Sequence, residues 1–149
     1  MTGRWLRLVL ATLGTGLLAA AAQGAEYRSV TASAAVLYDA PSARSKKMFI
    51  GPRGMPLEVL STLPAWIKVR DVTGDVLWVA RADLGPVTQV VARRLTNLRA
   101  EPKERAAVGV QVAAGVLLEV LGDDPSGWIK VRHAEGAIGY VKADEIFGR

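Results

Sequence analysis

The chain has 149 residues, of which half are apolar and 22% are charged. A chain of this length forms one domain or two very small ones, and its composition is typical of a globular protein. The absence of cysteine excludes disulfides, thiolate metal ligands and a cysteine nucleophile, and the single histidine, His133, excludes a multi-histidine metal site. We therefore expect neither a metal nor a cofactor.

Residues 1–24 have the three-part pattern of a secretory signal peptide. Arg4 and Arg7 give a positive start, residues 8–22 form an apolar stretch, and small residues surround a polar one at its end. A membrane anchor is the alternative, but the stretch is short and is interrupted by Gly and Thr. We expect cleavage after Gly24 or after Ala22. The protein would then be exported, periplasmic or extracellular, with no membrane span after cleavage.

The charge of the remaining chain is mild. Removal of residues 1–24 takes away two of the 19 basic residues and none of the 14 acidic ones, which leaves a net charge of +3. Nucleic-acid-binding domains have a stronger and more clustered positive charge. We therefore expect no nucleic-acid partner.

An internal repeat organises the rest of the chain. The segment WIKVR occurs at residues 66–70 and again at 128–132, and a LEVL segment precedes each copy. A glycine and an aromatic–valine pair follow at the same offset of 62, as Gly74, Trp78 and Val79 in the first copy and Gly136, Tyr140 and Val141 in the second. The repeat predicts a duplicated domain, with copies at residues 28–85 and 87–148.

Each copy is predicted to be all-β. The LEVL and WIKVR segments are short, aliphatic and bounded by turn residues, as in a barrel or sandwich. The mature chain keeps no helical apolar period for three turns, so residues 81–84 and 143–146 are predicted to form short 3₁₀ turns. A copy of about 60 residues buries only a modest core, so we expect the two copies to contact each other.

The two copies resemble bacterial SH3 (SH3b) domains. The second copy follows the family pattern from Asn97 to Val141: an L-R-x-x-P start, a glycine, a LEVL strand, GW-x-KVR, a glycine and an aromatic–Val pair. The first copy departs from it at Ala65 and Leu77, where the family has glycine. The resemblance implies an all-β fold of two tandem SH3-like small β-barrels. It also implies targeting or protein-interaction modules of the kind attached to many cell-wall hydrolases.

Strand alternation predicts which residues could bind a ligand. In WIKVR the Ile and Val side chains should face the core, so that Trp, Lys and Arg face outwards. A simple hairpin would place the aromatic residue of the next strand opposite the Trp of each copy. The candidate ligand-binding residues are Trp66, Lys68, Arg70, Trp78, Trp128, Lys130, Arg132 and Tyr140.

Two interpretations of these outer aromatic residues remain open. Rings flanked by cations can stack on a peptide or sugar and pair with its carboxylates. Alternatively, the rings stabilise the hairpin, or pack under the N-terminal strand or against the sister domain. Three other features have structural explanations: His133 in an exposed loop, Arg93 and Arg94 on a solvated strand edge, and the basic residues 44–47 in a solvated loop.

We therefore expect a non-catalytic binding module that recognises peptidoglycan, through its stem peptides, or an envelope protein. The alternative is an accessory subunit for protein–protein interaction unrelated to the cell wall. A Ser-His-Asp triad could form only around His133, and no motif places a serine and an acid beside it. No phosphate loop, paired-acid motif or metal-ligand spacing is present either. We expect no catalytic residues.

Overall fold

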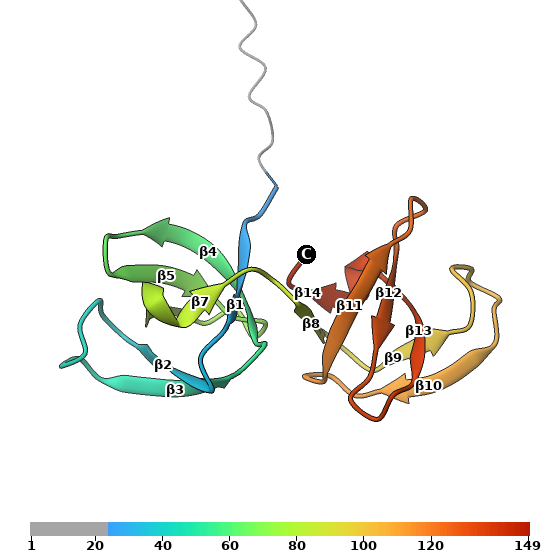
Figure 1. Cartoon of the computed structure of the whole chain (residues 1–149), viewed down its shortest axis with the longest axis horizontal. Coiled ribbons are helices and arrows are strands. Elements are labelled where there is room, and N and C mark those ends of the chain that lie inside the picture. Colours follow the sequence, from blue (N-terminus) through green and yellow to red (C-terminus); the bar gives the residue numbers. More distant parts are fainter. Residues whose placement is uncertain (1–23) are drawn as a thin grey trace, which may run out of the picture.

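The computed structural model of the chain describes residues 24–149, which form fourteen strands in two sheets (Figure 1). Apart from Gly24, the predicted signal peptide lies outside the described residues. Among the residues that are described, no helix has the length and apolar character needed to cross a bilayer. The predicted all-β tandem architecture is confirmed.

The first sheet has the strand order β3-β2-β6-β5-β4-β1-β7, and its neighbouring strands are antiparallel. The strands are β1 (Tyr27–Val30), β2 (Ala34–Tyr38), β3 (Lys47–Pro52), β4 (Pro56–Thr62), β5 (Trp66–Arg70), β6 (Val76–Ala80) and β7 (Leu84–Gly85). A 3₁₀ turn, η1 (Arg81–Asp83), precedes β7.

The second sheet repeats this order as β10-β9-β13-β12-β11-β8-β14. Its strands are β8 (Gln89–Ala92), β9 (Thr96–Arg99), β10 (Val108–Val112), β11 (Leu117–Asp123), β12 (Trp128–Arg132), β13 (Ile138–Lys142) and β14 (Ile146–Phe147). The turn η2 (Ala143–Glu145) corresponds to η1, so both predicted 3₁₀ turns are confirmed.

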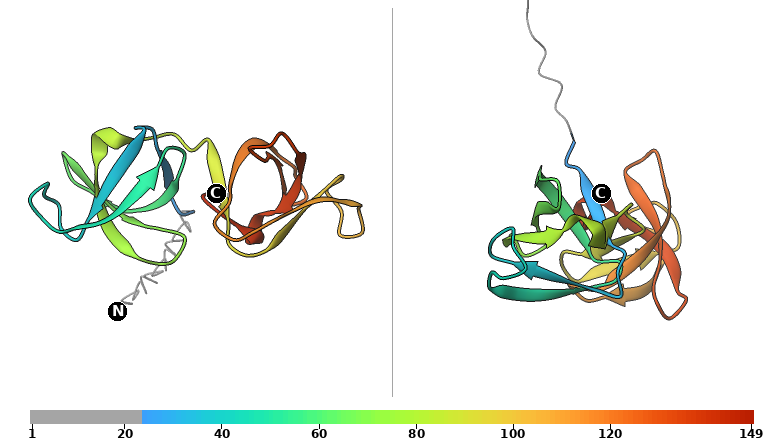
Figure 2. Two further views of the ribbon diagram at one scale, coloured as in Figure 1. Left: turned by 90° about the horizontal axis from the view of Figure 1, so that it is seen from below. Right: turned by 60° about the vertical axis from the view of Figure 1, so that its left-hand side comes forward.

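Each sheet curls around its own core, but hydrogen bonds do not close it into a barrel (Figure 2). In the first sheet β3 and β7 are the outermost strands and are not paired with each other; in the second sheet the same is true of β10 and β14. The closing strands have only two residues each and pair with β1 and β8. The predicted barrel is therefore an open, strongly curled sheet.

Alternating side chains of the WIKVR strands build the two cores. Ile67 and Val69 are buried in the first core, and Ile129 and Val131 are buried in the second. Full burial of an aliphatic side chain stabilises the fold by about 1.5–3 kcal/mol. The predicted inward orientation of the aliphatic residues is confirmed.

The two sheets contact each other directly, as expected for small domains. The ring of Tyr27 on β1 meets the ring of Phe147 on β14 edge to face, with 5.2 Å between the ring centroids. Next to it, a side chain at Gly148 would collide with Pro56, because a Cβ atom there would lie 2.7 Å from the proline Cβ. The C-terminus of the second domain therefore packs on the first domain.

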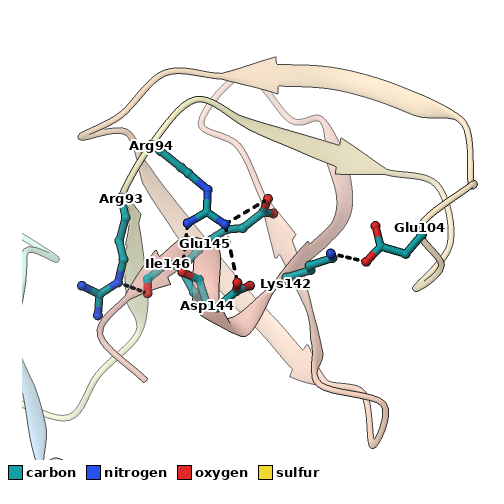
Figure 3. Close-up of polar contacts among 7 residues, drawn as sticks. All are labelled: Arg93, Arg94, Glu104, Lys142, Asp144, Glu145 and Ile146. Atoms are coloured by element: carbon teal, nitrogen blue, oxygen red, sulfur yellow. Dashed lines mark hydrogen bonds and ion pairs between the residues drawn. The ribbon is translucent and has the colours of Figure 1, made fainter.

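Arg93 and Arg94 stabilise the end of β8 (Figure 3). The Nε of Arg93 donates a 2.7 Å hydrogen bond to the carbonyl oxygen of Ile146, and Arg94 pairs with Asp144 at 3.5 Å and with Glu145 at 3.6 Å. The strand β8 lies between β11 and β14 rather than at an edge. Both arginines are exposed, but they bind the turn η2 and the first residue of β14. The prediction that they lie on a solvated strand edge was therefore wrong.

Candidate ligand-binding site

The register of the first domain places a lysine, not a tryptophan, opposite Trp78. Strands β5 and β6 pair Lys68 with Trp78 and Trp66 with Ala80. The predicted Trp66–Trp78 pair is therefore wrong, because the register is shifted by two residues and Trp66 and Trp78 are not opposite each other. Paired residues of neighbouring strands share a face, so Lys68 and Trp78 lie together on the outer side of the sheet.

The β5–β6 turn explains this difference. It contains the five residues Asp71–Asp75, whereas a three-residue turn would produce the predicted register. The Asp71 carboxylate accepts hydrogen bonds from the Thr73 and Asp75 amides, both at 2.9 Å, and Gly74 has the positive φ of 98° that the turn requires. The longer turn is thus stabilised by its own side chain.

The second domain has the same register. Strands β12 and β13 pair Lys130 with Tyr140 and Trp128 with Lys142, so the predicted Trp128–Tyr140 pair is also wrong. The backbone of His133 closes an equivalent five-residue turn, because its amide donates to the carbonyl oxygen of Ala137 at 2.8 Å. Turn length is therefore a shared property of the two copies.

A lysine lies over an aromatic ring on the outer face of each domain. The Nζ of Lys68 lies 5.8 Å from the centroid of Trp78, and the Nζ of Lys130 lies 5.9 Å from the centroid of Tyr140. Such cation–π contacts contribute about 0.5–1 kcal/mol at exposed sites. Within residues 24–149, no carboxylate lies within ion-pair distance of either lysine. Both ammonium groups can therefore donate hydrogen bonds to a carboxylate of a ligand.

The two candidate arginines are engaged by neighbouring carboxylates. Arg70 pairs with Glu58 of β4 at 3.0 Å, and Arg132 pairs with Glu119 of β11 at 3.0 Å. Exposed pairs of this kind contribute at most about 1 kcal/mol. A ligand carboxylate would nevertheless have to compete with an existing partner, so the lysines are better anchors than the arginines.

The first domain extends its lysine–tryptophan contact into a row across four strands. Strand pairing aligns Lys68, Trp78, Tyr38 and Lys47 on β5, β6, β2 and β3. The half-buried Trp66 stands edge-on to Tyr38, with a centroid separation of 5.4 Å. We call these five residues the aromatic row. Sequence reasoning missed Tyr38 and Lys47, although the burial of Leu37 in the same strand is the alternation that places Tyr38 outside.

The second domain covers its equivalent face. Lys142 lies over Trp128, 5.7 Å from the ring centroid. The carboxylate of Glu104 binds the ammonium group of Lys142 (Figure 3). The hydrogen bond to Glu104 raises the pKa of Lys142 above its ordinary value. Trp128 is only 8% exposed and lies under Lys142, which for this ring favours the packing interpretation over ligand binding. Arg99 lies opposite Tyr140, where the first domain has Tyr38.

His133 is less exposed than predicted. It lies in the β12–β13 turn, as expected, but its side chain is 20% exposed and its Nδ1 accepts a hydrogen bond from the amide of Glu135 at 3.2 Å. The turn itself holds the imidazole against the backbone. In the part of the chain that the structure describes, no cluster of three or more potential metal ligands is found.

The duplicated, curled sheets and their WIKVR core strands define a tandem SH3-like protein. The sequence pattern of the family described as bacterial SH3 domain matches twice, over residues 31–86 and 92–148. The chain therefore belongs to the bacterial SH3 domain family. Among curated proteins, no match to the chain is found.

Three solved structures are similar to parts of this chain. NlpC2 from Trichomonas vaginalis is 16% identical over 85% of the chain, NlpC1 from the same organism is 15% identical over 87%, and an NlpC/P60 family protein from Bacillus cereus is 15% identical over 82%. The TM-score is 0.39 in each case. The matched regions cover 49%, 48% and 56% of those proteins, so this chain spans about half their length.

Proposed function

We propose that this chain is a non-catalytic binding protein of the cell envelope and that the aromatic row of its first domain binds peptidoglycan stem peptides. Bacterial SH3 domains are typically cell-wall binding modules, which supports the choice of ligand. The observation that carries the proposal is the alignment of two aromatic rings between Lys68 and Lys47. Export, which the pattern of residues 1–24 supports, would bring the protein to this ligand.

The dimensions of the aromatic row suit a short extended peptide. Its two lysines are three strand spacings apart, or about 14 Å along the sheet. An extended peptide of four residues has a length of about 14 Å as well. The lysines would pair with carboxylates of the peptide, and the rings of Trp78 and Tyr38 would stack on the groups between them.

The second domain would contribute a weaker, accessory site. It keeps the contact between Lys130 and Tyr140, but Arg99 replaces the second ring and Lys142 covers Trp128. A ligand at this site would contact one exposed ring, Tyr140, beside the positively charged side chains of Arg99 and Lys142. We therefore assign the principal binding site to the first domain.

Binding to purified peptidoglycan at low salt tests the proposal. Lys68→Gln should weaken retention of the protein about tenfold, because it removes a charge-assisted contact. Lys130→Gln is the matched control, since it makes the same change at the equivalent position of the second domain, and it should weaken retention less than about threefold. Failure of the wild type to bind, or equal losses in the two variants, would contradict the assignment.

A titration with a synthetic stem peptide separates charge from stacking. The peptide with free carboxylates should bind, and the same peptide with amidated carboxylates should bind about tenfold more weakly. Trp78→Ala should weaken both peptides, since each retains its stacking groups. Incubation of the protein with peptidoglycan should release no soluble fragments; release that is lost in His133→Ala would show an enzyme instead.

A further inference from the structure

The edge strand β3 exposes three consecutive apolar side chains. Met48 is 48% exposed, Phe49 is 42% exposed and Ile50 is 64% exposed. Because β3 is the outermost strand of its sheet, its outer backbone groups also have no neighbouring strand. Proteins usually protect such edges with charged residues, since an apolar edge can pair with another strand.

The corresponding strand of the second domain lacks this feature. Strand pairing places Gly109, Val110 and Gln111 of β10 where β3 has its three apolar residues. The two strands occupy the same edge of equivalent sheets, so the fold itself does not require large apolar side chains there. β10 exposes one large apolar side chain, Val108, so the run of three is specific to the first domain.

Grooves flank the exposed edge. Phe49 lines one of about 460 Å³ between β3 and the β5–β6 turn. Its walls are polar at Asp71, Thr73 and Asp75 of the turn and apolar at Met48, Met55, Val72, Val76 and Leu77. Phe49 also lines a smaller hollow of about 200 Å³ that reaches Val91 and Leu117 of the second domain. Apolar side chains of an added strand could therefore enter these two hollows next to Phe49, with any acidic residues of the strand kept away from Asp71 and Asp75.

Cations stand at both ends of β3. Arg44 and Lys46 precede the strand and Arg53 follows it, and all three are exposed. Across residues 24–149, none of their side chains forms an ion pair with a carboxylate, although the backbone amide of Lys46 donates a 3.0 Å hydrogen bond to Asp39. A segment that pairs with β3 would gain favourable charge interactions if it carried acidic residues at its ends.

This charge pattern disfavours a second copy of the chain as the occupant. If two β3 strands paired antiparallel about Phe49 and Ile50, Lys47 of each copy would lie opposite Pro52 of the other, beside Arg53. Two such approaches of like charge would form in every dimer. An acidic partner removes this repulsion and neutralises the unpaired cations.

We propose that β3 binds an extended segment of another protein, with alternating apolar residues flanked by acidic residues, as an additional strand of the first sheet. The backbone of the segment would hydrogen-bond to the free edge, and its apolar side chains would enter the grooves beside Phe49. This interaction goes beyond the proposed peptidoglycan binding, because it uses the backbone edge and the apolar side chains of β3; the two sites share only Lys47, the first residue of β3.

The test uses the chain without residues 1–24, titrated with a synthetic peptide of seven residues. The peptide has two acidic residues at each end and Val-Thr-Val between them. The peptide should shift the amide resonances of β3, slow their hydrogen exchange, and bind with a Kd of about 100 μM. The double variant Phe49→Val, Ile50→Gln should bind at least tenfold more weakly, and its fold should survive because β10 carries these residues. Ile138→Gln, at an exposed apolar residue of β13, is the matched control and should leave binding unchanged.

Charge reversal provides the decisive comparison. Lys46→Glu with Arg53→Glu should lose the acidic peptide and instead bind a peptide with lysines at its ends. The proposal is overturned if the acidic peptide does not bind the wild type at about 1 mM, or if both peptides bind the wild type equally. It is also overturned if the free protein dimerises through β3. Retention of the Phe49→Val, Ile50→Gln variant on peptidoglycan, measured separately, tests the aromatic row, because this variant leaves Lys47, Lys68 and the rings unchanged.

Discussion

The two WIKVR strands are identical in sequence, yet their tryptophans have different environments. Trp66 is half-buried and stands beside Tyr38, whereas Trp128 is buried beneath Lys142. The differences come from neighbouring strands: the residue opposite Trp66 is Ala80, and the residue opposite Trp128 is Lys142. A duplicated strand thus contributes to the proposed binding surface in one copy and to a structural contact in the other, because its neighbours differ.

The largest expected effect distinguishes the two tryptophans. Trp128→Ala should lower the free energy of unfolding by about 3–5 kcal/mol, because it removes a buried aromatic side chain. Trp66→Ala should cost less, about 1–2 kcal/mol, since its side chain is partly exposed. Urea denaturation followed by circular dichroism measures both values. Equal losses would show that the two sites are equally buried in solution.

A glycine in the second domain marks a closer approach of its strands. A Cβ atom at Gly139 would lie 2.8 Å from the Cβ of Leu98 and 3.0 Å from the carbonyl oxygen of Arg99. Gly139→Ala should therefore reduce the unfolding free energy by about 2 kcal/mol. Gly122→Ala is its control, because a Cβ atom there meets no atom within 4 Å. The control should unfold like the wild type; a similar loss in both would refute the steric explanation.

A single substitution should make the first face resemble the second. Ala80→Lys places an ammonium group opposite Trp66, as Lys142 stands opposite Trp128. By covering the ring, it should weaken stem-peptide binding about threefold, equivalent to about 0.6 kcal/mol. Isothermal titration measures the effect. Unchanged or stronger binding would show that Trp66 does not contribute to the site.

The cross-strand ion pairs should have small effects. Arg70→Gln and Arg132→Gln should each change the unfolding free energy by less than about 1 kcal/mol, because both pairs are exposed. The loss should be slightly larger for Arg70, whose partner Glu58 is better shielded from solvent than Glu119. Thermal unfolding at low and high salt checks the order, which high salt should erase.

The smallest expected effect is a change in one pKa. Glu104 raises the pKa of Lys142, so the stabilisation from this pair is complete below the pKa of the lysine in the unfolded chain and is lost as the pH rises through the raised pKa. Glu104→Gln should lower the pKa of Lys142 in an NMR titration. Glu101→Gln is the control, because Glu101 pairs with Lys103 and not with Lys142. A shift in the control would point to a general charge effect.

The fold could be predicted from local sequence patterns, because both strand alternation and the internal repeat are visible within short segments of the chain. The burial of Ile67 and Val69 follows from the two-residue period of a strand, and the repeat extends the same result to Ile129 and Val131. The register was wrong because it depends on turn length, and the side chain of Asp71 stabilises a five-residue turn where a shorter one was assumed. The open edges depend on the length of β7 and β14, which short sequence segments do not reveal.

By itself, the sequence determined that two equivalent β domains follow one another and which side of each WIKVR strand faces the core. Both properties are local, because alternation and repetition act within a few residues. Only the tertiary structure decided that Tyr38 and Lys47 extend the lysine–tryptophan contact, and that Lys142 covers Trp128. These contacts join strands distant in sequence, so they depend on strand order and register, which the whole domain sets together.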